Sequence, residues 1–243
     1  MNALIEELLK KLTLLDKDNL DVFLLSIFQN VHPIIISFLN FHALEISEKN
    51  SKMKECILSS DVLFRDGVGI EKICKKLKID PKYNCNGTDL IPMIVDFSKT
   101  IDIPVVLIGS DNATVKKAAE FLQSSGINVS LYLDGYSEEK IYFESIKKIS
   151  GRAIILIGMG MPKQEILSYK LKRLTKEPLI FINGGAIIDR LGGKVKRCPK
   201  WMIYYKVEWL YRFISEPRRL YKRIIIGGIN FIRIYKGVQI GNS

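Results

Sequence analysis

The chain has 243 residues, 47% of them hydrophobic and 26% charged, so it is long enough to bury the core of one large domain. Its four cysteines are scattered with no C-x-x-C pair, and no uncharged apolar run approaches the roughly 20 residues that span a bilayer. These features argue against a disulfide scaffold, a zinc site and an integral membrane protein. The start does not read as a signal peptide, so we expect a reducing, cytoplasmic location.

The net charge of +11 is concentrated near the C-terminus. Residues 1–193 hold 25 Lys and Arg against 24 Asp and Glu, whereas residues 194–243 hold 12 against two. This asymmetry predicts two parts, a nearly neutral catalytic α/β domain at 1–193 and a basic aromatic appendage at 194–243.

The N-terminal part begins with apolar residues at helical spacing, which predict an amphipathic helix over 3–15. The polar turn 16–18 matches the D-x-D spelling of metal-dependent sugar transferases, but no strand precedes it, so we assign it no metal. The β-branched run 34–39 predicts a strand buried on both faces and ending at Asn40. A helix from His42 to about Leu58 follows, with His42 interpreted as a capping or surface residue.

A second strand, 61–64, leads into a glycine-rich turn that contains Asp66 and Gly67. In open α/β folds ligands bind where strands end and helices begin, so Asp66 is a candidate base or ligand holder. Asp-Gly is also a common turn and Asp an ordinary helix cap. Both interpretations stay open at this point.

The next segment contains a helix over 70–77 and then a turn at Asn86 that opens a helix running to Lys99. Asn86 and Asp89 either cap this helix or bring an amide and a carboxylate close to the other strand ends.

Strands at 104–109, 129–133 and 153–157 then alternate with helices at 113–123 and 138–149. The third of these strands ends in Gly158-Met159-Gly160-Met161-Pro162-Lys163-Gln164-Glu165. Gly160 permits close approach of a ligand to the backbone, and Gln164 would lie at the positive end of a helix, which suits a phosphate or a sugar. The third glycine of a dinucleotide fingerprint is missing, so no nicotinamide cofactor is expected.

The last strand, 179–183, is followed by Gly184 and Gly185. Two glycines at a strand end again suggest that a ligand lies against the backbone there. Asp189 could hold a ribose or a base edge, or could be a surface acid of a helix. The fold class is α/β: a Rossmann-like layered fold with a mainly parallel sheet flanked by helices, plus a basic helical C-terminal appendage.

Aromatic and cationic side chains alternate in the appendage, and Glu216-Pro217 divides it into two helical segments. This composition suits an anionic membrane surface, where rings lie at headgroup depth. A core-packing helix with a solvated basic face and a nucleic-acid-binding surface are the alternatives.

Several of these motifs together resemble the WecG/TagA/CpsF glycosyltransferases of bacterial surface-polysaccharide synthesis, over about residues 32–235. The motifs that carry the resemblance are Asp66-Gly67-Val68-Gly69-Ile70, Asn86-Gly87-Thr88-Asp89-Leu90, Gly158-Met159-Gly160-Met161-Pro162-Lys163-Gln164-Glu165, Gly184-Gly185-Ala186-Ile187-Ile188-Asp189, Arg197-Cys198-Pro199-Lys200-Trp201-Met202, Glu208-Trp209-Leu210-Tyr211-Arg212 and Glu216-Pro217-Arg218-Arg219-Leu220.

The resemblance implies an inverting, metal-independent transfer of a sugar, often N-acetylmannosamine, from a UDP donor to an undecaprenyl-diphosphate-linked acceptor sugar. It makes Asp66 the catalytic base and assigns functional positions to Asn40 and Gln164. It also implies that the appendage docks on the inner face of the membrane and helps to close the active site.

We therefore expect a UDP-sugar and a polyprenyl-diphosphate-linked acceptor as partners, no cofactor, no metal and no nucleic acid. Self-association into a homo-oligomer is compatible with the apolar helices. The donor-binding candidates are Asn40, Gly67, Asn86, Asp89, Gly160, Gln164, Gly184, Gly185 and Asp189. Candidates for the acceptor diphosphate or the membrane are Arg197, Arg212, Arg218 and Arg219.

Two motifs depart from the family pattern. Phe38-Leu39-Asn40 stands where T-x-N is common, and Asn84-Cys85-Asn86 where many members have Arg-Val-Thr. An arginine there would clamp a diphosphate, so its absence leaves the donor sugar and the phosphate contacts open. A non-catalytic nucleotide- or nucleic-acid-binding protein that uses the basic tail remains the alternative function.

Overall fold

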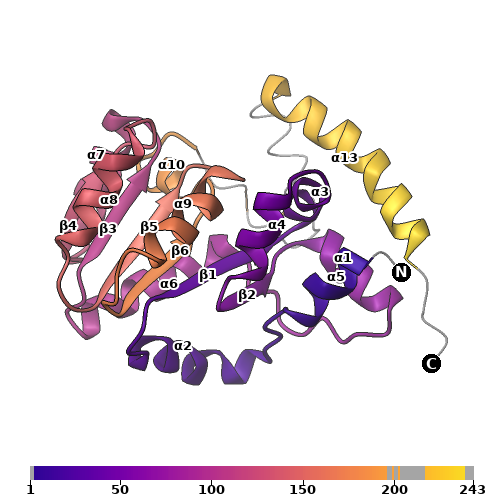
Figure 1. The fold of residues 1–243 in the computed structure, drawn as a ribbon, viewed down its shortest axis with the longest axis horizontal. Helices are drawn as coiled ribbons and strands as arrows, with labels where there is room; N and C mark the ends of the chain where they lie inside the picture. Colours follow the sequence, from indigo (N-terminus) through magenta and orange to yellow (C-terminus); the bar gives the residue numbers. More distant parts are fainter. Residues whose placement is uncertain (1–2, 196–198, 200–201, 203–216, 239–243) are drawn as a thin grey trace.

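The computed structural model describes residues 3–195, 199, 202 and 217–238. Its centre is one sheet built from β1 (Ile34–Leu39), β2 (Val62–Arg65), β3 (Val105–Gly109), β4 (Val129–Leu133), β5 (Ala153–Gly158) and β6 (Leu179–Asn183). The spatial order is β2-β1-β6-β5-β3-β4, and every neighbouring pair is parallel (Figure 1). The predicted α/β class and mainly parallel sheet are confirmed.

Helices connect the strands and cover both faces of the sheet. They are α1 (Ala3–Lys10), α2 (Leu20–Gln29), α3 (Phe41–Lys49), α4 (Ser51–Leu58), α5 (Val68–Lys76), α6 (Gly87–Thr100), α7 (Asn112–Ser124), α8 (Glu139–Lys147), α9 (Lys163–Lys172), α10 (Ile187–Leu191) and α13 (Pro217–Gly237).

Alternate residues of each buried strand supply the core on the two faces. In β1, Ile34 and Ile36 pack in a cluster with residues of α2, α6, α7 and α10. Ile35 faces the other way, into a cluster with α8 and α9. Leu39 and Leu63 join a third cluster, formed with α1, α3, α4 and α5. Burial on both faces explains why these strands read as continuous apolar runs rather than as alternating ones.

The structure differs from the predicted elements in three places. The first helix ends at Lys10 and not at residue 15, because Thr13 pairs with β2 and its N–H donates to the Leu63 carbonyl at 2.8 Å. A short helical turn over 17–19 and the helix α2 occupy a stretch for which no element was predicted. The helix predicted from His42 to about Leu58 is two helices, because the Asn50 side chain accepts from the Met53 N–H and starts α4 anew.

The described part of the appendage, α13, packs along α3 and is drawn in yellow at the edge of the molecule (Figure 1). Asn230 Nδ2 donates to Glu45 Oε1 at 2.7 Å, and the Phe231 and Phe41 rings meet edge to face at 5.1 Å. Ile234 and Val238 are buried in the cluster that contains α1 and α3. This end of the chain is therefore anchored on the α/β part, and no described helix is both long and apolar enough to cross a membrane.

Candidate active site

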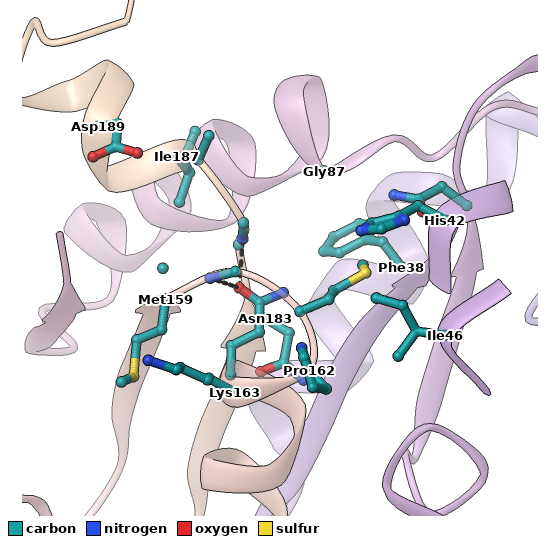
Figure 2. A pocket seen from close by; sticks show the side chains of 18 of the residues that line it. Phe38, His42, Ile46, Gly87, Met159, Pro162, Lys163, Asn183, Ile187 and Asp189 are labelled. Atoms are coloured by element: carbon teal, nitrogen blue, oxygen red, sulfur yellow. Dashed lines mark hydrogen bonds between the residues drawn. The ribbon is translucent and has the colours of Figure 1, made fainter. Parts of the chain in front are cut away.

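A cavity of about 1280 Å³ lies along the carboxyl edge of the sheet. Ligands of open α/β folds bind at this edge, since the strand-to-helix loops open there. The loop after each of the six strands contributes to the lining, through Asn40, Asp66, Ser110, Gly135, Met159 and Gly184 in the order β1 to β6. Figure 2 shows Asp189 and His42 on opposite sides of the pocket, with Asn183 between them.

Asp66 lies at one end of this cavity, half-buried, directly after β2. Its backbone N–H donates to the Leu39 carbonyl at 2.9 Å. The next residue, Gly67, has φ of +82°, a conformation that favours glycine, and its N–H donates to Asn84 Oδ1 at 3.3 Å. Asn84 thus helps to hold the loop that carries Asp66.

Arg65, the last residue of β2, also bonds to this loop, since its Nη1 donates to the Gly67 carbonyl at 3.5 Å. It is 2% exposed, and its guanidinium donates to the carbonyl oxygens of Pro81 and Lys82 at 2.9 and 3.2 Å and lies 3.8 Å from Glu71. A buried arginine held by carbonyl oxygens and a carboxylate is a rigid support. Sequence reasoning missed this residue, because a lone Arg at the end of a strand carries no distinguishing signal.

Asn40 follows the neighbouring strand and also lines the cavity. Its Oδ1 accepts from the Ala43 N–H at 3.0 Å and caps α3, so the part of the amide that can meet a ligand is Nδ2. In the first turn of that helix, His42 Nδ1 lies 3.9 Å from Glu45 Oε2. The other oxygen of Glu45 accepts the hydrogen bond from Asn230 of α13. Gly227 and Asn230 complete the lining, so α13 forms part of this end of the cavity.

Gln164 is among the residues that line the cavity, and its side chain is fully buried. Its Oε1 accepts from the N–H groups of Gly160 at 3.2 Å and Gly185 at 3.0 Å, the two bonds dashed in Figure 2. Both N–H groups are thus paired with the Gln164 side chain. The residue ties the loop after β5 to the loop after β6.

The two glycines after β6 have different physical roles. A Cβ at Gly184 would lie 2.4 Å from Ile187 Cγ2 and 3.0 Å from Leu156 Cδ1, so packing excludes a side chain there. Gly185 has φ of +59°, and a Cβ added to it would meet nothing within 4 Å, so its backbone conformation rather than space requires glycine.

Asp189 lines the opposite end of the cavity. Ser110 Oγ donates to its Oδ1 at 2.6 Å. Ser110 itself has φ of +57°, an unusual conformation for a residue with a Cβ. Tyr136, 77% exposed, lines the same end. Sequence reasoning missed both residues, although Ser110 at a strand end was a usable signal.

Several predicted site residues do not line the cavity. Asn86 and Asp89 bond to each other, with Asn86 Oδ1 accepting from the Asp89 N–H and Asn86 Nδ2 donating to Asp89 Oδ2, so together they cap α6. Gly67 shapes the loop beside Asp66 without lining the cavity. Arg197 and Arg212 lie outside the described residues. Arg218 and Arg219 belong to α13, and their side chains likewise lie outside what the structure describes.

The lining is mixed in charge. Among the described residues, Lys49, Lys163, Arg190 and Lys194 supply cations, and Lys194 is paired with Asp111 at 2.7 Å. This contact and the N–H of Thr114 hold the pKa of Asp111 well below its usual range. No group of three or more His, Cys, Asp and Glu side chains gathers as a metal site would require in the described part of the chain.

The chain matches a family model and is similar to curated proteins. The family model described as "Glycosyl transferase WecG/TagA/CpsF family" matches residues 10–238. A curated relative from Bacillus spizizenii is 24% identical over 173 residues, which cover 70% of this chain and 67% of the relative. That relative is named N-acetylglucosaminyldiphosphoundecaprenol N-acetyl-beta-D-mannosaminyltransferase.

Proposed function

Because this chain belongs to the WecG/TagA/CpsF family of glycosyl transferases, we propose that it moves an N-acetylmannosamine-like hexose from a UDP-sugar to a polyprenyl-diphosphate-linked acceptor sugar. The family supports the class of reaction, and the name of the Bacillus relative supports the acceptor. The observation that carries the assignment is one cavity with a carboxylate at each end, Asp66 and Asp189, on loops of different strands. One carboxylate suits a base, and the other suits a hydroxyl-bearing ligand.

In this proposal the nucleoside of the donor occupies the end formed by Ser110, Tyr136 and Asp189. A carboxylate has lone pairs on both oxygens, so Asp189, held at Oδ1 by the Ser110 hydroxyl, is a natural acceptor for ribose hydroxyl groups. The exposed Tyr136 ring offers a face on which a base can stack.

The acceptor sugar then occupies the end formed by Asn40, Asp66 and α13. Asp66 takes the proton of the acceptor hydroxyl as that oxygen forms its bond to the anomeric carbon, while the bond from that carbon to the UDP oxygen breaks. A single displacement of this kind inverts the anomeric configuration and needs one base.

The leaving UDP gains negative charge during this step. Lys163 and Arg190 line the cavity and can stabilise that charge without a metal. Arg197, Arg212, Arg218 and Arg219 of the appendage are further candidates for the diphosphates or for the membrane, and they stay predictions.

We further propose that the protein works at the inner face of the membrane, where a polyprenyl-linked acceptor is held. On the described part of α13, Ile229 and Ile232 are 64% and 55% exposed and lie beside the exposed Arg233 and Lys236, whereas Ile234 is buried. An apolar strip flanked by cations suits an anionic lipid surface.

The direct test is a screen of UDP-sugars for UDP release, with and without a synthetic lipid-diphosphate-N-acetylglucosamine acceptor. We expect release from UDP-N-acetylmannosamine that depends on the acceptor. Absence of release with every UDP-sugar, combined with tight and salt-sensitive binding of DNA or RNA, would instead favour the non-catalytic alternative.

A further inference from the structure

Glu165 is a buried carboxyl next to the cavity that has no role in the reaction described above. It lies in the first turn of α9 and is 2% exposed. Its Oε1 accepts from Gln164 Nε2 at 2.8 Å, and its Oε2 has no hydrogen-bond partner in the described structure. A buried carboxyl with one partner is costly, so its retention in the fold calls for a reason.

The orientation of the Gln164 amide is fixed by its neighbours. Two backbone N–H groups, those of Gly160 and Gly185, converge on one of its terminal atoms, which must therefore be the oxygen. The NH₂ group then faces Glu165. Reversing the amide would place NH₂ against two N–H donors and oxygen against a carboxylate, so this arrangement is the one that satisfies all three contacts.

We propose that Glu165 is a positioning residue: it orients the Gln164 amide and thereby holds the Gly160 and Gly185 loops at the spacing that shapes the donor cavity. Glu165 touches no substrate in this view and acts through Gln164. Donation from Gln164 Nε2 to the carboxyl also polarises the amide, which makes Oε1 a stronger acceptor for the two glycine N–H groups. The link to the donor rests on the proposed function, whereas the link between Glu165 and the two loops does not.

The side chain of Glu165 is separate from the polar cluster beside it. That cluster runs from Ser37 through Asn183 to Ser168, whose Oγ donates to the backbone carbonyl of Glu165 at 3.1 Å. A change confined to the Glu165 side chain therefore probes its contact with Gln164 and leaves the backbone link to Ser168 in place.

Glu165 titrates near neutral pH, independently of the charged and titratable groups on the helices packed against it. Burial raises its pKa to about 7. Cys56 faces it from α4, and burial raises the pKa of that thiol to about 11, so the thiol stays neutral. Ion pairs on the packed helices lie at the surface: Lys52 with Glu55 and Lys54 with Glu7 on α4, and Lys170 with Glu139 and Lys172 with Asp61 on α9.

The test reads the two loops directly, by NMR of protein labelled with ¹⁵N-glycine. In the wild type we expect the Gly160 and Gly185 amide signals to shift with pH, with a midpoint near 7. Glu165→Gln keeps a carbonyl acceptor for Gln164 but cannot ionise, so the signals stay protected from hydrogen exchange and stop shifting. Glu165→Leu removes the acceptor, and exchange of both amides speeds up about tenfold or more.

A matched control is Glu177→Gln. Glu177 Oε2 accepts from the Gly151 N–H at 2.6 Å at the opposite, amino-terminal edge of the sheet. The same chemical change there should alter the Gly151 signal and leave Gly160 and Gly185 as in the wild type.

Steady-state kinetics test whether the Gly160 and Gly185 loops affect binding of the donor. Glu165→Leu should raise KM for the UDP-sugar about tenfold with a smaller change in kcat, and Glu165→Gln should restore KM.

Unchanged glycine exchange in a folded Glu165→Leu, or a pH-dependent shift that persists in Glu165→Gln, overturns the proposal. If Glu165→Leu does not fold, the titration in Glu165→Gln decides it. If the wild type turns over no UDP-sugar, the proposed function fails and the glycine signals still decide this inference.

Discussion

The backbone N–H of Asp66 donates to the carbonyl oxygen of Leu39 at 2.9 Å. Asp66, the candidate base, thus follows β2 in the chain and is hydrogen-bonded to the last residue of β1. The residue after Leu39 is Asn40, which lines the same cavity. Two polar residues from separate parts of the sequence are thus held at one end of the cavity by the register of two parallel strands.

Replacing Asp66 by Asn should abolish sugar transfer and leave UDP binding nearly unchanged. The amide cannot accept the proton of the acceptor hydroxyl, and loss of a general base typically costs about 10²–10⁴-fold in rate, here expected in kcat. UDP release assays and calorimetric titration with UDP measure the two effects. Asp96→Asn, at an exposed position of α6, is the control and should retain full activity. Transfer by Asp66→Asn at the wild-type rate would exclude Asp66 as the base.

Replacing Asn84 by Ala should slow transfer about tenfold without weakening UDP binding. The substitution removes the acceptor of the Gly67 N–H and frees the loop that carries Asp66, at a cost of about 1 kcal/mol. Chemical denaturation and steady-state kinetics report the two quantities. Asn84→Asp keeps an acceptor oxygen and should behave close to the wild type, and equal losses in both variants would contradict this role.

Two replacements of Ser110 separate its hydroxyl from its backbone. Ser110→Ala and Ser110→Gly both remove the bond to Asp189, so both should raise KM for the donor several-fold. The φ of +57° suits glycine, so Ser110→Gly should be more stable than Ser110→Ala by about 1 kcal/mol. Thermal unfolding and donor kinetics test this pair, and a similar stability for both variants would mean that the backbone strain is absent.

Stability should depend on pH through Glu165. Its pKa in the folded protein, about 7, lies above the 4.5 of an ordinary glutamate, so between these values the folded state keeps a proton that the unfolded state releases. The contribution of this group to stability is therefore full below pH 4.5 and falls as pH rises toward 7, by up to about 3 kcal/mol. Urea denaturation from about pH 5 to 8 should show this fall in the wild type relative to Glu165→Gln. Parallel curves for the two proteins would show that Glu165 ionises normally.

Membrane association should depend on the exposed isoleucines of α13. The double change Ile229→Ser with Ile232→Ser should weaken flotation with anionic liposomes about tenfold or more, because two apolar side chains no longer enter the interface. Val22 and Val31 are 70% and 68% exposed on other surfaces, so Val22→Ser with Val31→Ser is the matched control. Equal flotation of the isoleucine variant and the wild type would remove α13 from the membrane contact.

The sheet was largely predictable because β1, β2, β3, β5 and β6 are buried on both faces, and such strands appear as continuous apolar runs, such as Ile34–Leu39. The helix α2 was not predicted, since its apolar residues Leu24, Ile27 and Phe28 sit among others that are exposed, and the periodicity is weak. The break between α3 and α4 was missed for a different reason: Asn50 ends one helix and caps the next without any interruption in the apolar pattern.

By itself, the sequence determined the α/β class, the candidate residues at the strand ends and the family resemblance, because these depend on local patterns along the chain. The tertiary structure decided how those residues are used, because hydrogen-bond partners come from distant segments. It showed that Asn86 and Asp89 satisfy each other and that Gln164 binds two glycine N–H groups on separate loops. It also placed Ser110 against Asp189, 79 positions away, a pairing that no spacing in the sequence encodes.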